Sequence, residues 1–119
     1  IIIMSRSKTK LYVVHVVPQD FIQKDSIKTE VFTNSSTAFQ SLIEPVQKVL
    51  YDWQHTAGLS KDDEENIRYL EETINEFVEY VSQKDVDYCK CQELIDNLNN
   101  DNNYFYEKMY VEVVEKEIM

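Results

Sequence analysis

The chain has 119 residues, of which 43% are apolar, and a formal net charge of −10 at pH 7. This length suits one domain with a core of modest size, and no apolar run approaches the about 20 residues that a membrane-spanning helix needs. Residues 1–60 carry six Lys or Arg and five Asp or Glu, whereas residues 61–119 carry six and seventeen. Because so acidic a second half repels nucleic acid and anionic membranes, we expect neither as a direct partner.

The first ten residues are expected to be a flexible lead-in to a single domain that spans residues 1–119. Ile1–Ile3 precede Met4 and are too short for a signal peptide. Two interpretations are open: Met4 is the natural start and the three isoleucines are an addition, or the sequence is a fragment of a longer chain. With no export signal in view, the expected location is cytoplasmic.

Three stretches predict strands. Leu11–Val17 is dense in β-branched and aromatic residues and ends at Pro18, which predicts a central strand. Ile27–Phe32 alternates polar and apolar residues and predicts a second strand, antiparallel to the first. Tyr104–Ile118 returns to strand character, and its glutamates suit the edge of a sheet.

The first predicted helix covers residues 36–55, where apolar residues recur at helical spacing. Pro45 lies inside this segment and lacks a backbone N–H, so we expect a kink or a break near Ile43. A further helix is predicted from Asp85 or Val86 to Leu98. It should end at residues 99–103, because Asn and Asp favour turns.

Residues 60–81 predict one long helix, around which the rest of the chain is organised. Ser60 can cap its start, and acidic residues fill its first turn. Apolar residues at steps of three and four form one stripe, which we expect to lie on the sheet: Ile67, Leu70, Ile74, Phe77 and Val81. The opposite side is acidic, through Asp62, Glu65, Glu72, Glu76 and Glu79.

The order strand, strand, helix, helix, helix, strand predicts an α+β fold. We expect a small antiparallel sheet of about three strands, with the helices packed on one face. The last strand can return to the sheet only if the helices between stay on one side of it.

Residues that could carry catalysis are few. His15 is expected to be a half-buried strand residue, and His55 to lie at a helix end. Cys89 and Cys91 point about 200° apart on a helix, and the chain lacks further soft ligands for zinc, so reduced structural thiols are expected. No phosphate-binding loop, dinucleotide-binding motif or zinc-protease motif is present in the sequence. We therefore expect no enzyme, metal site or cofactor.

The candidate site residues are acidic or aromatic. Carboxylates three or four positions apart on a helix lie about 5–6 Å from one another, a scale similar to the spacing of phosphates along DNA. Aromatic residues gather before the last strand and are expected to meet a partner or a second copy of the chain. The predicted partner-binding set is Asp62, Asp63, Glu65, Glu72, Glu76, Glu79, Tyr104 and Tyr106. The alternative is that the acidic side is only a solvated helix face.

A resemblance adds a class of protein to this interpretation. Tyr12-Val13-Val14, then Val31-Phe32-Thr33-Asn34, then a helix that opens with Ala38 resemble the start of many small bacteriophage accessory proteins, over about residues 11–50. The resemblance implies a host-takeover or anti-defence protein in the cytoplasm of an infected cell. It transfers no functional residue.

Two functions remain open on the sequence. The first is a non-enzymatic phage-type inhibitor that binds a host or anti-phage defence protein with a basic surface, by mimicry of nucleic acid. The second is an oligomeric protein that sequesters a nucleotide-like signalling molecule. The second function has little support, because a nucleotide needs side chains that bind phosphate and the sequence has only two arginines, Arg6 and Arg68.

Overall fold

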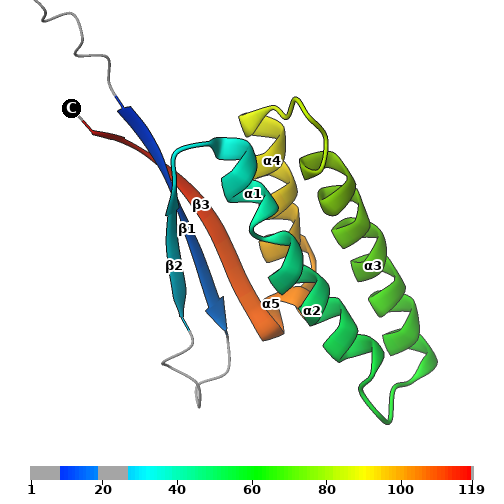
Figure 1. Ribbon diagram of the computed structural model, residues 1–119. Coiled ribbons are helices and arrows are strands. Elements are labelled where there is room, and N and C mark those ends of the chain that lie inside the picture. Colours follow the sequence, from blue (N-terminus) through cyan, green and yellow to red (C-terminus); the bar gives the residue numbers. More distant parts are fainter. Residues whose placement is uncertain (1–8, 19–26, 119) are drawn as a thin grey trace, which may run out of the picture.

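Three antiparallel strands form the sheet of the computed structural model, which describes residues 9–18 and 27–118 (Figure 1). β1 (Thr9–Pro18) lies between β2 (Lys28–Phe32) and β3 (Met109–Ile118). Both neighbours run antiparallel to β1. The predicted α+β class, the central place of the first strand and the edge place of the last strand are therefore confirmed.

The first strand begins earlier than expected, and this corrects the predicted lead-in of residues 1–10. Thr9 and Lys10 belong to β1, where they lie opposite Ile118 and Glu117 of β3. The Lys10 ammonium also lies 3.1 Å from a carboxylate oxygen of Glu115, so pairing with a distant strand orders these polar residues. Residues 1–8 lie outside the described residues.

The predicted break in the first helix is confirmed. α1 (Ser35–Gln40) begins after Asn34, whose side-chain oxygen accepts a hydrogen bond from the Thr37 N–H at 3.2 Å. α2 (Ile43–Gln54) follows after two residues. Pro45 stands in the first turn of α2, where its missing N–H removes no intrahelical bond.

The long helix α3 (Lys61–Val81) matches its prediction. Ser60 accepts a hydrogen bond from the Asp63 N–H at 3.1 Å, and Asp63 accepts one from the Ser60 N–H at 3.0 Å. This reciprocal pair is a capping box, which satisfies two backbone donors at the helix start. All five residues of the predicted apolar stripe are buried.

The third predicted helix starts later than expected. α4 (Tyr88–Asp96) begins after Asp87, whose side chain accepts a hydrogen bond from the Cys89 N–H at 2.8 Å. It does not stop at the asparagine-rich residues but continues as a π-helical turn, η3 (Asn97–Asp101). The prediction that these residues end the helix is wrong, because buried Asn99 finds partners on β3 that a local pattern cannot reveal.

The segment before the last strand is helical rather than extended. α5 (Asn103–Lys108) is capped by Asn102, whose side-chain oxygen accepts hydrogen bonds from the N–H groups of Tyr104 and Phe105. The predicted strand over residues 104–118 is therefore wrong in its first five residues. Phe105 is fully buried, so this one ring of the aromatic segment packs in the core.

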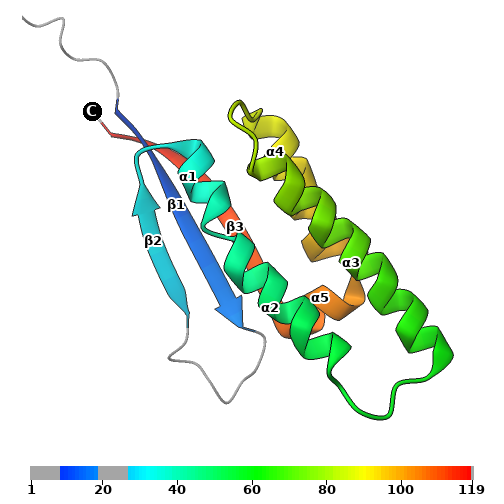
Figure 2. The same cartoon turned by 45° about the vertical axis from the view of Figure 1, so that its right-hand side comes forward.

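The helices cover one face of the sheet, but α3 does not touch it closely (Figures 1 and 2). α1 packs on β1 and β2, while α4, η3 and α5 pack on β3. α3 packs mainly on α2 and α4 and forms an outer layer. The expectation that its stripe lies on the sheet is wrong. The reason is the width of the sheet: three strands about 4.8 Å apart are covered by two rows of helices, each about 10 Å wide, so no room remains on the sheet for α3.

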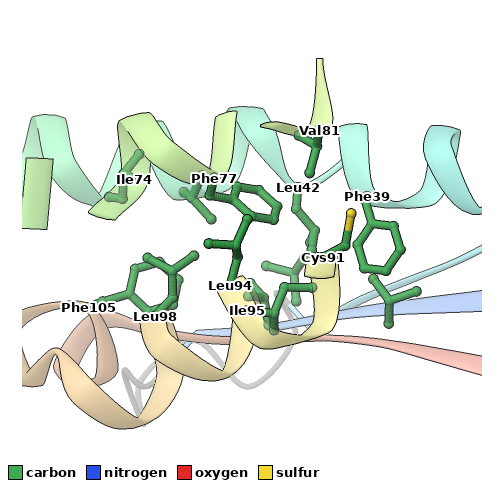
Figure 3. Close-up of a cluster of buried hydrophobic side chains, with 14 of the residues drawn as sticks. Phe39, Leu42, Ile74, Phe77, Val81, Cys91, Leu94, Ile95, Leu98 and Phe105 are labelled. Atoms are coloured by element: carbon green, nitrogen blue, oxygen red, sulfur yellow. The ribbon is translucent and has the colours of Figure 1, made fainter. Parts of the chain in front are cut away.

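The core fills the space between these layers (Figure 3). α3 contributes Ile74, Phe77 and Val81, which face the apolar side chains of α4 and η3. On the sheet side, Val14 and Val16 of β1 are buried beneath the helices. Burying each such side chain contributes about 1.5–3 kcal/mol, which offsets the repulsion among the carboxylates on the outer side of α3.

Candidate functional site

Five of the six exposed carboxylates of α3 form the predicted acidic side of the helix, and the sixth is Glu64. The five lie opposite the buried stripe, so they face solvent and not the core. We call this set the acidic ridge: Asp62, Glu65, Glu72, Glu76 and Glu79.

Within the described residues, no lysine or arginine forms an ion pair with the acidic ridge. On the sheet, Lys10 Nζ forms an ion pair with Glu115 Oε1 at 3.1 Å, and His15 Nε2 lies 3.9 Å from Glu112 Oε1. Arg68 belongs to α3 itself and is exposed, yet it makes no such contact. The charge of the ridge is therefore left for solvent ions or for a partner.

The linear charge density of the ridge is comparable to that of a nucleic acid strand. A helix rises about 1.5 Å per residue, so the ridge extends about 26 Å from Asp62 to Glu79. Five charges over this length give about one per 5 Å, against about one per 3.4 Å along one DNA strand. The ridge therefore offers about two thirds of the charge density of a single strand.

Two other predicted site residues bind each other. The Tyr104 hydroxyl donates a hydrogen bond to Asp63 Oδ1 at 2.5 Å. This bond, and then the hydrogen bonds from Ser60, lower the pKa of the Asp63 carboxyl. The same bond to Asp63 is the main cause that raises the pKa of Tyr104. Both side chains are thus engaged within the chain, in contrast to the ridge carboxylates.

Two exposed tyrosines are more available. Tyr106 is 53% exposed and lies within α5. Tyr69 is 58% exposed and occupies the gap between Glu65 and Glu72, so it adds a ring to the acidic face. The sequence prediction did not include Tyr69, although a large aromatic residue on the polar side of an amphipathic helix is the pattern that could have identified it.

A groove of about 750 Å³ lies elsewhere, between α2 and the helix-facing side of β1 and β2. Its floor is apolar and includes Val14, Val16 and Val49. At one end the Trp53 indole N–H donates a hydrogen bond to the Tyr104 carbonyl at 2.6 Å. Charged residues line the rim: Lys28, Glu30, Glu44, Lys48, Asp52, Glu107 and Lys108.

The groove exists because α2 diverges from β2 along its length (Figure 2). α1 holds the chain against β1 and β2, whereas α2 packs on α3 and α5 instead. The break at residues 41 and 42 lies where the chain passes from packing on the sheet to packing on α3 and α5.

Each histidine contacts a neighbouring side chain, and one of the two cysteines is buried. His15 is half-buried in β1, as predicted, and its Nδ1 is hydrogen-bonded to Thr29 Oγ1 at 3.1 Å. His55 follows the last turn of α2 and stacks on Tyr51, with ring centroids 3.9 Å apart. Burial raises the pKa of the Cys91 thiol to about 11, which keeps it protonated and unreactive at neutral pH.

Among residues 9–18 and 27–118, no group of three or more His, Cys, Asp or Glu side chains is placed to hold a metal ion. None of the helices in these ranges combines the length and apolar character needed to cross a bilayer.

No protein-family model, curated protein sequence or solved structure matches this chain.

Proposed function

We propose that this chain is a non-enzymatic interaction protein of the phage-accessory type, which inhibits a host or defence protein by binding its basic surface through the acidic ridge. The target class is a protein whose own groove normally holds nucleic acid. Tyr69, in the gap of the ridge, would add an aromatic contact near the centre of the interface.

One observation supports this proposal most strongly. Five carboxylates are exposed on one face of α3, and no lysine or arginine of the described residues pairs with them. Like charges at helical spacing destabilise the helix by a few tenths of a kcal/mol per pair. An arrangement that lowers stability and stays unpaired is better explained by a partner than by folding.

The mechanism is electrostatic competition. A basic groove attracts the ridge over about 8 Å at physiological ionic strength, so the encounter is fast and weakens as salt is added. Once bound, the ridge occupies the positions of phosphates and excludes the nucleic acid. Inhibition then needs no chemical step.

The test compares the wild type with two variants of equal charge. The ridge variant replaces four carboxylates, and the control variant replaces four exposed ones elsewhere on the chain. Binding is measured against a panel of basic DNA-binding proteins, including nucleases, at rising salt and with duplex DNA as competitor. The variants are E65Q/E72Q/E76Q/E79Q and E44Q/D52N/D101N/E107Q.

We expect the wild type and the control variant to bind a member of the panel in a salt-dependent manner. The ridge variant should bind about tenfold more weakly or worse. Equal losses for both variants, or an affinity that ignores salt, would rule out recognition through the acidic ridge.

The groove supports a second candidate, the sequestration of a nucleotide-like signalling molecule. Its volume lies in the range of small-molecule sites. Four carboxylates on the same rim oppose an anionic ligand, so this candidate ranks second. Calorimetry with linear and cyclic nucleotides tests it, because K48A should abolish their binding while the ridge variant should not change it.

A further inference from the structure

The two edges of the sheet use their backbone groups differently. On the outer edge of β3, Asn99 donates a hydrogen bond to the Val111 carbonyl at 2.6 Å and accepts one from the Val111 N–H at 3.2 Å. Gln92 donates to the Val113 carbonyl at 2.6 Å. Side chains thus occupy the middle of this edge, a device that prevents strands from pairing with other chains.

These contacts show which way the backbone groups of each strand point across the sheet. The backbone N–H and C=O groups of Val111 and Val113 point away from the sheet. Because successive residues of a strand point these groups to opposite sides, those of Glu112 point toward β1. Val14 lies opposite both Val113 and Glu30. It therefore directs its backbone groups to β2, and Glu30 directs its groups back to β1.

By the same alternation, Ile27, Thr29 and Val31 direct their backbone N–H and C=O groups away from the sheet. Among the described residues no hydrogen bond to these outward groups is observed, in contrast to the edge of β3. β2 therefore presents an open edge that a further strand can extend.

The side chains of this edge are arranged symmetrically about Thr29. Ile27 is 53% exposed and Val31 is 57% exposed. Val31 lies opposite Val13, on the sheet face that the helices leave uncovered, and the alternation of side chains along an extended segment assigns Ile27, directly before β2, to the same face. Lys28 and Glu30 are also exposed and lie on the helix-facing side. From residue 27 to 31 the order is apolar, basic, polar, acidic, apolar.

We infer that β2 is a self-association edge, where two copies of the chain pair antiparallel about a two-fold axis at Thr29. In this register Lys28 lies opposite Glu30 of the partner subunit, and Ile27 lies opposite Val31 of the partner subunit. Each pair occurs twice. The charged pairs fall at non-hydrogen-bonded positions, where the Cα atoms are only about 4.5 Å apart.

The neighbouring symmetric registers are disfavoured. A shift of the axis to Glu30 places two glutamates opposite each other, and a shift to Lys28 does the same with two lysines. Like charges directly opposite destabilise a strand pair. The charge pattern therefore selects both the partner, a second copy, and the register.

The paired sheet has six strands and leaves the acidic ridges free. β2 and α3 lie on opposite sides of the molecule in both views (Figures 1 and 2), so the two ridges are far from the axis. On the uncovered face, the row of Val114, Val13 and Val31 continues into Ile27 of the partner subunit. This inference does not depend on the proposed function.

The experiment is sedimentation velocity over a concentration series. Two short strands bury less area than a standard interface, so we expect a weak, reversible dimer of the wild type. Either K28E or E30K alone places like charges opposite each other and should weaken the dimer about tenfold or more. A mixture of the two variants should restore association, because each supplies the charge that the other lacks.

A backbone variant gives an independent readout. V31P removes an outward N–H that β1 does not use, and proline is tolerated at such edge positions. It should abolish the dimer and leave the circular dichroism spectrum unchanged. A wild type that stays monomeric up to about 1 mM, or single charge variants that dimerise as the wild type does, would overturn the inference.

Discussion

The hydroxyl of Tyr104 donates a hydrogen bond to the carboxylate of Asp63, which lies 41 residues earlier in the chain. Asp63 also accepts the Ser60 N–H in the capping box of α3. One carboxylate therefore fastens the start of the long helix to α5. The Tyr104 ring packs edge-on against Trp53, with centroids 4.8 Å apart, which holds the hydroxyl in place.

Replacing Tyr104 by Phe should raise the pKa of Asp63 toward its ordinary value of 3.8, because the Tyr104 hydroxyl is the main cause of its depression. The stability that Asp63 contributes is present above pH 3.8 and is lost as the pH falls through the lower pKa of the folded state. In the variant this loss should be smaller. Carboxyl chemical shifts and urea unfolding between pH 2 and pH 7 measure both effects.

The control for this prediction is Tyr106→Phe, which removes a hydroxyl from an exposed ring. It should leave the pKa of Asp63 and the acid profile unchanged. Identical acid profiles for the wild type and Y104F would contradict the role assigned to the Tyr104 hydroxyl.

Asn99→Ala should destabilise the fold by about 1–3 kcal/mol, because it leaves the N–H and carbonyl of Val111 without their partners. Urea unfolding measures the loss, and hydrogen exchange of the Val111 amide should accelerate in the same variant. Asn100→Ala, at an exposed position, should stay within about 0.5 kcal/mol of the wild type. Equal effects of the two substitutions would be inconsistent with the pairing of Asn99 and Val111.

The two cysteines should differ sharply in reactivity. Cys89 is exposed, whereas Cys91 is buried and its pKa is raised to about 11 by that burial. A thiol reagent at pH 8 should modify one cysteine per folded chain and two in denaturant. In C89S the folded chain should resist the reagent, and rapid labelling there would show that the Cys91 environment opens in solution.

Neutralising part of the acidic ridge should stabilise the isolated protein. Glu76 is four residues from Glu72 and three from Glu79, so E76Q relieves two repulsions of a few tenths of a kcal/mol each. The free energy of unfolding should rise by that amount at low salt, and the gain should shrink at high salt. E107Q, on α5, serves as the control. A destabilised E76Q variant would mean that the ridge supports the fold.

The long helix could be predicted from the sequence because its determinants are local. Ser60 and Asp63 cap it within one turn, and the steps from Ile67 to Val81 define its buried side. The exposed ridge follows from the same periodicity. The break before Pro45 was likewise predictable, because a proline has no backbone N–H to donate to the carbonyl four residues earlier, so a continuous helix would lose that hydrogen bond.

The asparagine-rich segment shows where local patterns are insufficient. Asn99 and Asn102 favour turns on propensity, yet one enters a π-helical turn and the other caps α5. The amide of Asn99 reaches Val111, 12 residues away, and Trp53 binds the Tyr104 carbonyl over 51 residues. No periodicity within either segment encodes such pairings.

The sequence by itself determined the α+β order of elements, the capped amphipathic helix and its acidic outer side, because these depend on residues within one or two turns of one another. Only the tertiary structure decided that α3 lies on other helices, that Asp63 is engaged by Tyr104, and that β2 has an open edge while β3 is closed by Asn99. Those outcomes depend on which residues far apart in the sequence come into contact. The contacts that form are those that bury apolar side chains and satisfy buried hydrogen-bonding groups over the whole chain, which no local pattern encodes.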